Sequence, residues 1–162
     1  MRMKNRMLFG ILAVVALCIL AIAPNSALAQ GPKEDRIDVV SDNPFKDTVG
    51  SLTTALKKEG MMVVATIDHQ NMLKMVGASI KGATTIEFGK PDMGKMLLPM
   101  APEVGLEMPG KFFVWERSDG KTVISYRKVA PLFASYGNEN IAGAGKMMDM
   151  MAEKLMHAAA AR

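Results

Sequence analysis

The clearest helical pattern in the chain lies in its second quarter. Four apolar residues recur there at intervals of four, three and four positions: Phe45, Val49, Leu52 and Leu56. This spacing is typical of an amphipathic helix with one buried face. Asn43 followed by Pro44 predicts an N-cap and a proline at the first helical position. The basic residues Lys57 and Lys58, and then Gly60, predict where the helix ends.

Short apolar and β-branched runs predict strands on either side of this helix. Five such runs stand out in the sequence, at residues 37–41, 61–67, 83–88, 111–117 and 121–126. The composition of 61–67 favours a central strand, because it is almost entirely apolar. The last two runs are separated only by Ser118, Asp119 and Gly120, which predicts a tight hairpin between them.

A short helix is expected directly after the second of these strands. Asp68 is suited to cap its first turn, because a carboxylate accepts hydrogen bonds from free backbone N–H groups. We expect the helix to run to about Val76, with Met72, Met75 and Val76 on its inner side, and to stop at Gly77.

The second half of the chain predicts two more helices and one long connection. The helices are expected over 131–136, where Gly137 follows, and over about 140–160. The connection, 89–109, is rich in glycine, proline and methionine, and contains at most one or two helical turns around 93–100. Long structureless connections are uncommon, so we interpret it as a functional or crossover loop. The mixture of elements predicts an α+β fold with helices packed on one face of a small, mostly antiparallel sheet.

The N-terminal segment has the pattern of a secretory signal peptide. The first six residues carry three basic side chains and no acidic one, and residues 7–23 are uncharged and mostly apolar. Pro24 ends this run, and Ala27-Leu28-Ala29 supplies small residues around an expected cleavage site after Ala29. The alternative is an uncleaved membrane anchor, although 17 residues are few for a bilayer span. We therefore expect an exported protein, periplasmic or secreted, that meets the membrane only if this segment is kept.

Cleavage changes how the overall composition is interpreted. The full chain of 162 residues has a net charge of +4, one cysteine and 16 methionines. The signal segment contains Cys18 and three of the 20 basic residues but none of the 16 acidic ones. The remaining 17 basic residues give a net charge of only +1, which argues against nucleic-acid binding. Without cysteine, the exported part has no disulfide framework, yet it keeps 13 methionines.

A series of short motifs in the mature chain resembles a known family. The motifs occur in this order: Lys58-Glu59-Gly60-Met61, Ile67-Asp68-His69, Phe88-Gly89-Lys90-Pro91, residues 105–111, Val114-Trp115-Glu116 and residues 120–126. Together they resemble the uncharacterised family called domain of unknown function 302, over roughly residues 39–137. The resemblance implies a two-layer sandwich that is often a homodimer, and it identifies His69 as a characteristic histidine. It implies no biochemical activity.

The chain therefore divides into four expected regions: a signal peptide over 1–29, a linker over 30–36, the domain over 37–137 and a methionine-rich C-terminal helix over 138–162. The most reactive pair is Asp68-His69, because strand ends often carry functional groups and imidazole transfers protons near neutral pH. The alternative is a purely structural role, in which Asp68 caps a helix and His69 forms a hydrogen bond with the neighbouring loop. We assign an expected ligand surface near His69 and the 89–109 loop to five residues: Asp68, His69, Gly89, Pro91 and Tyr126.

The C-terminal helix offers a second candidate chemistry. Its residues Ile141, Ala144, Met148, Met151 and Leu155 form a stripe that predicts packing against a core or a partner. Met147, Met150 and Met151 stand at i, i+3 and i+4, so their thioethers can lie on one helix face. Thioethers favour Cu(I) or Ag(I). Loop methionines Met93, Met96 and Met100 are further candidate ligands.

Three functional hypotheses follow from these residues. The first is a non-enzymatic exported domain that binds a small ligand or an exported protein partner and needs no cofactor. The second is a soft-metal binding protein that uses Met147, Met150 and Met151 for Cu(I) or Ag(I). The third is a small enzyme with His69 as acid or base, although the usual hydrolase and phosphate-binding motifs are absent from the sequence.

Overall fold

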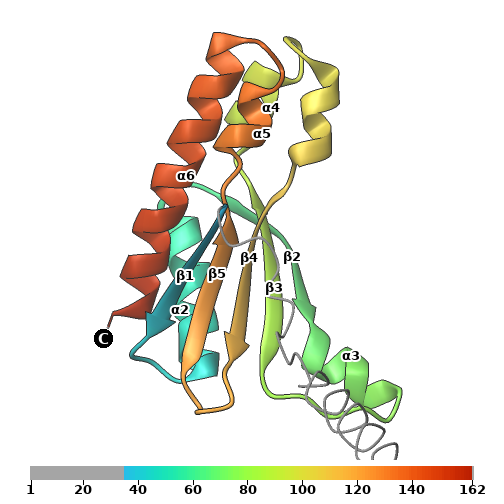
Figure 1. Cartoon of the computed structure of the whole chain (residues 1–162), viewed down its shortest axis with the longest axis vertical. Coiled ribbons are helices and arrows are strands. Elements are labelled where there is room, and N and C mark those ends of the chain that lie inside the picture. The colour runs from blue at the N-terminus through green and yellow to red at the C-terminus, as the bar shows by residue number, and fades with distance from the viewer. Residues whose placement is uncertain (1–34, 162) are drawn as a thin grey trace, which may run out of the picture. The chain divides into compact units, whose positions relative to one another are not determined.

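A five-stranded sheet organises residues 35–161, the part of the chain that the computed structural model describes (Figure 1). The strands are β1 (Arg36–Ser41), β2 (Met62–Asp68), β3 (Ala83–Gly89), β4 (Gly110–Glu116) and β5 (Thr122–Arg127). Their order across the sheet is β1-β5-β4-β3-β2, and all four neighbouring pairs are antiparallel. The predicted hairpin corresponds to β4 and β5, with Gly120 at a positive φ of 83° in its turn.

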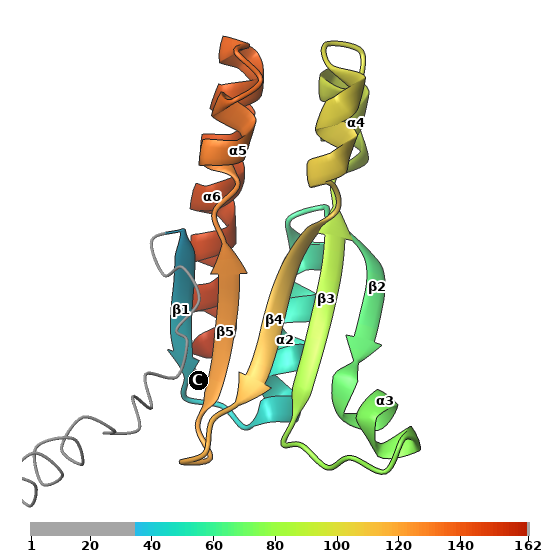
Figure 2. The same ribbon diagram turned by 45° about the vertical axis from the view of Figure 1, so that its right-hand side comes forward.

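Two long helices cover one face of this sheet. These are α2 (Phe45–Lys58) and α6 (Glu139–Ala160), which lie together behind the strands in Figure 2. The buried cluster between the layers contains residues from both helices and the three central strands, among them Leu52, Leu56, Ile86, Phe112, Ile124 and Leu155. The α+β sandwich with helices on one face is therefore confirmed, and burial of these side chains supplies its main stabilisation.

The remaining helices are short. They are α3 (His69–Met75), α4 (Pro91–Leu97), the 3-10 helix η2 (Pro102–Glu107) and α5 (Ala130–Ala134). A second buried cluster joins α4, η2, α5 and the first turns of α6 beyond the end of the sheet: Leu97, Val104, Val129, Phe133, Ile141 and Ala144. The 89–109 segment is thus mostly helical and partly buried, rather than an open loop.

The predicted stripe on the C-terminal helix is confirmed by its packing. Ile141 and Ala144 belong to the second cluster, and Leu155 belongs to the main core, while Met148 and Met151 are half-buried between them. One helix therefore connects both clusters. Among the described residues, no helix combines the length and the apolar character that crossing a bilayer requires. The predicted signal peptide lies outside the described residues.

The run 61–67 was expected in the centre of the sheet, and this was wrong. It forms β2, which within residues 35–161 pairs only with β3 and so occupies an edge of this sheet. A register shift between Val63 and Ala65 interrupts the pairing, and Val64 is 60% exposed there. An apolar composition does not distinguish a central strand from an edge strand, and a bulge of this kind protects an edge from pairing with other chains.

Asn43 was expected to cap α2, and this was also wrong. The helix begins at Phe45 with Pro44 in the capping position and no side-chain cap. The Asn43 amide instead donates hydrogen bonds to the carbonyl oxygens of Ala159, at 3.4 Å, and Ala161, at 2.9 Å. The last carbonyl groups of a helix need donors, and α6, 116 residues further along the chain, supplies a better partner than the local backbone.

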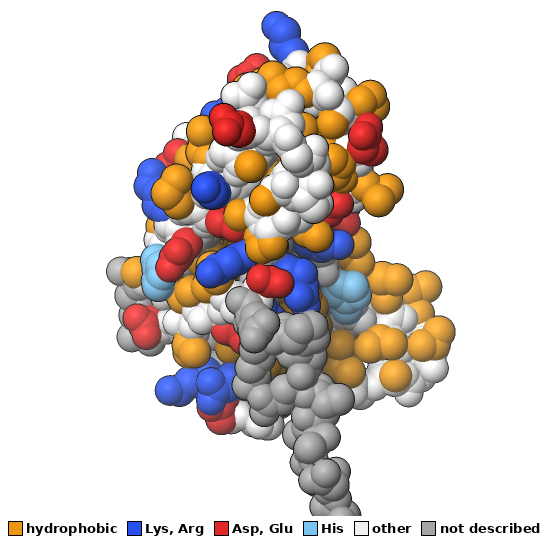
Figure 3. All heavy atoms as spheres, turned by 45° about the horizontal axis from the view of Figure 1, so that its top comes forward, with side chains coloured by type: hydrophobic (Ala, Val, Ile, Leu, Met, Phe, Trp, Pro, Cys, Tyr) orange, Lys and Arg blue, Asp and Glu red, His pale blue; other side chains and the backbone are white. Residues whose placement is uncertain are grey.

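The cap of α3 is confirmed, but its predicted inner side is wrong. Asp68 accepts a hydrogen bond from the Asn71 N–H at 2.9 Å, as an N-cap does. The helix has no buried residue, and Met72, Met75 and Val76 are 56%, 80% and 78% exposed. The spacing of apolar residues predicts that one side of the helix is apolar, but it does not predict what covers that side. In the structure, α3 lies beyond β2 and away from α2 and α6 (Figure 1). Figure 3 shows hydrophobic side chains gathered on this lower right part of the surface.

Candidate functional site

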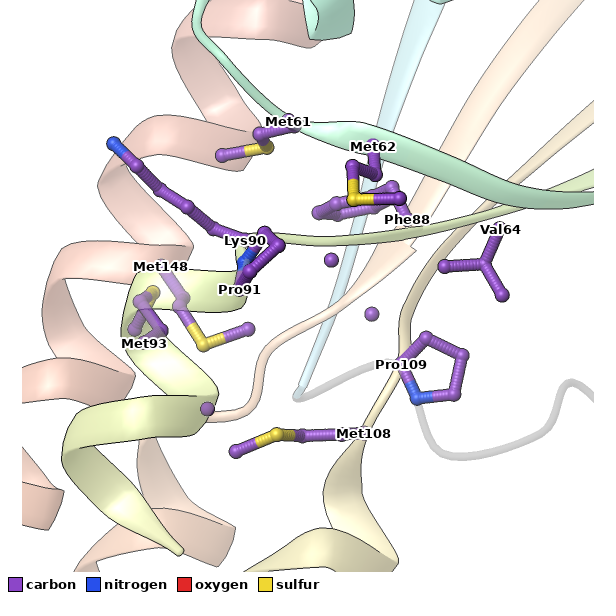
Figure 4. Close-up of a pocket in the computed structure, with 13 residues that line it drawn as sticks. Met61, Met62, Val64, Phe88, Lys90, Pro91, Met93, Met108, Pro109 and Met148 are labelled. Carbon is purple, nitrogen blue, oxygen red and sulfur yellow. The ribbon is translucent and has the colours of Figure 1, made fainter.

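A methionine-lined pocket opens at the end of the sheet where β3 leads into α4. Its volume is about 360 Å³. Five of its lining residues are methionines that come from different parts of the chain (Figure 4): Met61, Met62, Met93, Met108 and Met148. Phe88, Val64 and two prolines complete its largely apolar wall. Methionine side chains are flexible and polarisable, so such a wall adapts its shape to an apolar guest.

Packed aromatic rings and glycines shape the wall of the pocket. Phe88 stacks on Phe112 with ring centroids 4.7 Å apart, and its ring also lies close to Gly110. A Cβ on Gly110 would lie 3.0 Å from the Phe88 ring, so only glycine fits there without displacement. A Cβ on Gly89 would meet nothing within 4 Å, which means that empty space lies in front of this residue.

Among the described residues, Lys90 is the only charged one that lines this pocket. Its side chain runs outward past Met61 in Figure 4, so the ammonium group lies at the rim rather than among the methionines. The Lys90 ammonium forms no hydrogen bond or ion pair within the described part of the chain, although its charge, after that of Lys154, helps to lower the pKa of the Glu59 carboxyl. A ligand with an anionic end would therefore find its charge partner at the mouth of the pocket and its apolar partners inside.

His69 stands away from this pocket, on the open face of the sheet. Its Nε2 lies 2.8 Å from Thr85 Oγ1, and its ring meets the edge of Phe113 with centroids 5.9 Å apart. Within residues 35–161, no carboxylate is hydrogen-bonded to His69, and no group of three His, Cys, Asp or Glu side chains is placed to hold a metal ion. The surroundings of His69 are thus a hydroxyl and an aromatic ring.

The structure separates the residues that the sequence assigned to one ligand surface. Gly89 and Pro91 line the methionine-lined pocket, whereas Asp68 caps α3 and His69 bonds to Thr85. Thr85 precedes Gly89 by four residues on β3, which corresponds to about 13 Å at ~3.3 Å per residue. The Asp68-His69 pair and the 89–109 segment therefore belong to two different surfaces.

Tyr126 is a core residue whose hydroxyl already has a partner. Its side chain is 2% exposed, and its hydroxyl donates a hydrogen bond to Asp149 Oδ1 at 2.9 Å. Burial, followed by the nearby Asp149 charge and this hydrogen bond, raises the pKa of the Tyr126 phenol well above its usual range. The phenol stays protonated and supports the packing of α6 on β5.

The methionines predicted as metal ligands lie in the middle of α6 but do not share one environment. Met147 and Met150 are 57% and 66% exposed, while Met151 packs against the main core. Their neighbour Met148, predicted only as a packing residue, lines the pocket instead. The other pocket methionines, Met61, Met62 and Met108, gave no sequence signal beyond the overall abundance of methionine, because they converge only through the tertiary fold.

Comparison with known proteins identifies the family and the fold. The family model described as "Domain of unknown function DUF302" matches residues 37–160, so α6 lies within the match and is not an extension beyond it. An uncharacterised conserved DUF302 protein from Bacillus stearothermophilus has a similar crystal structure, with a TM-score of 0.71 and 18% identity. The similarity covers 78% of this chain and 98% of that one, and it supports the fold alone.

A second comparison gives matches to part of two ion channels. The chain is 28% identical over 85 residues to fluoride-specific ion channels FluC 1 of Brucella suis and of Brucella abortus. These 85 residues are 52% of this chain and 34% and 32% of the two channels, so the chain spans about a third of the relatives it matches.

Proposed function

The chain belongs to the family of the domain of unknown function DUF302, and from this premise we propose that it is an exported, non-enzymatic binding domain. Its ligand is a small, largely apolar molecule held in the methionine-lined pocket. The observation that carries the proposal is the pocket wall, which combines five methionines with Phe88 and Val64 and has its single charged residue at the rim. No acid–base pair accompanies His69 in the described part of the chain, so the enzyme hypothesis has less support.

The size and chemistry of the pocket define the ligand class. A volume of about 360 Å³ falls within the range of small-molecule sites, which is roughly 300–1,000 Å³. Burial of apolar surface contributes about 25 cal/mol per Å², so a hydrocarbon or aromatic body gains most from this wall. Lys90 at the rim favours a ligand that also carries a carboxylate or sulfonate.

The expected export agrees with the proposed function. A binding domain outside the cytoplasm needs neither cysteine nor a cofactor that the cell has to regenerate. The supporting features are the basic head, the apolar run over 7–23 and the small residues before Gln30. Mass spectrometry of the protein from a periplasmic extract or culture medium tests this: we expect a chain that begins at Gln30. An intact N-terminus in the membrane fraction would instead support the anchor.

We also propose that the domain forms a homodimer through α3. Its residues Met72, Met75 and Val76 form an apolar surface that is more than half exposed in the single chain. A contiguous apolar surface of this kind commonly marks a protein–protein contact. The pocket lies at the opposite end of β2 from α3, so dimerisation leaves it accessible.

Soft-metal binding remains a second candidate function because of a specific observation. Five thioethers line one pocket, and thioethers are ligands that Cu(I) accepts in the absence of thiols. The exposed pair Met147 and Met150 on α6 is the alternative location for the metal.

A fluorescence titration with 1-anilinonaphthalene-8-sulfonate tests the apolar-ligand proposal. The probe has an aromatic body for the methionines and a sulfonate for Lys90. We expect saturable enhancement of its emission with the wild type, and binding weaker by about tenfold or more with Gly89→Leu, which fills the space in front of Gly89. Gly143→Leu, at an open and exposed glycine of α6, is the matched control and keeps wild-type binding. Equal binding by both variants would refute the pocket as the ligand site.

Fluoride has to be tested as an alternative ligand, because the matched relatives are described as fluoride-specific ion channels. A small, strongly hydrated anion needs several donors to replace its water, and the pocket offers one cation at the rim. We therefore expect sodium fluoride, at the same ionic strength as a sodium chloride control, to leave probe binding unchanged.

A further inference from the structure

The face of the sheet opposite α2 and α6 carries a second hollow, near His69. This open-face hollow has a volume of about 560 Å³, and its walls include Arg36, Lys111, Phe113, Trp115, Ser125 and Arg127. These residues come from β1, β4 and β5, whose outward side chains alternate with the core residues on the other face. No helix of the described chain covers this face, as Figure 2 shows.

Three basic residues stand side by side along one edge of the hollow. Arg36 is directly opposite Arg127 in the β1–β5 register. On the other side of β5, Phe112 is opposite Tyr126, so Lys111 is the neighbour of Arg127. Like charges in adjacent cross-strand positions repel each other and destabilise a sheet. A row of this kind therefore favours an anion between its members.

Within the described residues, the carboxylates on this face form an ion pair with only one of these three cations. Asp38 Oδ2 accepts from Arg36 at 2.7 Å, and Glu87 stands opposite Lys111 in the β3–β4 register. Arg127 forms no ion pair within the described residues. A guanidinium presents parallel donors that match the two oxygens of a carboxylate, which makes Arg127 the natural centre of an anion contact.

The aromatic side chains beside this row are held in fixed positions. The Trp115 Nε1–H donates to Ser125 Oγ at 2.9 Å, and Ser125 in turn donates to Asp38 Oδ1 at 2.6 Å. This chain of hydrogen bonds links the indole ring to the carboxylate that holds Arg36. Phe113, the neighbouring ring, is 37% exposed and is supported at its edge by His69. Exposed rings next to cations form a surface for flat apolar groups.

We propose that the open-face hollow is a second binding site, specific for a small organic acid in which a carboxylate is attached to a flat apolar body. The carboxylate pairs with Arg127 and Lys111, and the flat body lies on Phe113 and Trp115. This site is independent of the methionine-lined pocket, because the two share no lining residue. It also gives His69 a role, which is to position the Phe113 ring through the edge contact while it is anchored on Thr85.

The single tryptophan of the chain makes this proposal directly testable. Trp115 lines the hollow, so its emission reports on occupancy. We expect a saturable change on titration of the purified exported protein with sodium benzoate. The neutral isostere benzamide, which keeps the ring but loses the charge, binds about tenfold more weakly or worse. Inorganic phosphate, which keeps the charge but lacks the flat body, is also weaker than benzoate.

Three variants locate the response. Arg127→Gln weakens benzoate binding about tenfold or more, while Lys46→Gln, the same charge change on α2, leaves it unchanged. Gly89→Leu, which fills the methionine-lined pocket, also leaves it unchanged. Equal binding of benzoate and benzamide, equal binding of phosphate, insensitivity to Arg127→Gln, or loss of the response in Gly89→Leu would each overturn the proposal. Absence of any saturable change would overturn it as well.

Discussion

The Tyr126 hydroxyl donates a hydrogen bond to Asp149 Oδ1 across 2.9 Å and so joins the last strand of the sheet to the long C-terminal helix. The same carboxylate accepts from the backbone N–H groups of Val129, at 2.8 Å, and Ala130, at 3.1 Å. Asp149 therefore receives three donors from the last part of β5, the connection that follows it and the first residue of α5. It fixes the position of α6, and with it the placement of Met148 in the pocket wall.

Removal of this carboxylate is expected to destabilise the whole domain. Asp149→Ala leaves the Tyr126 hydroxyl and two backbone N–H groups without their partner, which costs about 2–3 kcal/mol of unfolding free energy. This corresponds to a decrease in Tm of roughly 6–15 °C, measurable by circular dichroism. Glu153→Ala, one turn further along the exposed side of α6, is the control and changes stability by less than about 0.5 kcal/mol. Equal effects of the two variants would contradict the structural role of Asp149.

Burial of Tyr126 predicts a loss of stability in alkaline solution. The folded state raises the pKa of this phenol above the ordinary value of 10.0, so the folded protein keeps the proton that the unfolded chain releases. This contribution to stability is complete below pH 10 and decreases as the pH rises above it. We expect Tm to fall more steeply between pH 9 and pH 11 in the wild type than in Tyr126→Phe. Parallel profiles for the two proteins would refute this.

Two glycines of α6 are expected to respond in opposite directions to the same substitution. Gly143 is exposed and has nothing within 4 Å of an added Cβ, so Gly143→Ala stabilises the helix by about 0.5–1 kcal/mol. An added Cβ on Gly145 lies 2.7 Å from Phe133 Cβ and 3.0 Å from Ala130 Cα. Gly145→Ala therefore forces α5 away from α6 and destabilises the domain by about 1–3 kcal/mol. Urea unfolding of the two variants measures the change in the free energy of unfolding for each. If both variants are stabilised, α5 does not pack this closely against α6.

A Cu(I) titration distinguishes the two possible locations of a soft-metal site. We expect the triple variant with Met61, Met93 and Met148 changed to leucine to lose binding, because these three residues line one pocket. The matched triple, with Met147, Met150 and Met151 changed to leucine, keeps binding because two of its side chains are exposed to solvent. The opposite result would support the location predicted from the sequence. Equal, weak binding by all three proteins would end the metal hypothesis.

The proposed homodimer predicts a mass change in α3 variants. Met75→Lys combined with Val76→Lys places two charges on the apolar surface of α3, which we expect to convert a dimer into a monomer in light scattering after gel filtration. Leu106→Lys, at an apolar residue of η2 that is 89% exposed, is the control and leaves the mass unchanged. A wild-type monomer, or a dimer that resists both lysines, would refute this contact.

Local patterns in the chain were sufficient for most of its elements. The spacing from Phe45 to Leu56, the Asp68 cap and the stripe from Ile141 to Leu155 depend on neighbours within a few turns, and each is present in the fold. The partners of Asn43 and the edge position of β2 depend on residues far away in the sequence, and both expectations were wrong. Local spacing carries no information about which distant group competes for a side chain.

Some residues of the candidate site were likewise identified from the sequence, whereas others depend on the tertiary fold. Gly89 and Pro91 were identified from the sequence, and they line the pocket. The convergence of Met61, Met108 and Met148 was not predictable, because they are separated by up to 87 positions and meet only when α6 packs on the sheet. The sequence also did not predict that His69 and Gly89 lie far apart. Both come after a predicted strand, and the antiparallel pairing of β2 and β3 places the two residues at opposite ends of this strand pair.

The sequence by itself determined the family resemblance, the α+β class and the abundance of methionine in the chain, because these depend on composition, order and local periodicity. Only the tertiary structure decided that five methionines line one pocket, that Met147 and Met150 face solvent, and that Arg36, Lys111 and Arg127 form a row on a face that no helix of the described residues covers. The physical reason is that a binding site consists of side chains from strands and helices distant in sequence, and strand pairing and helix packing bring them together.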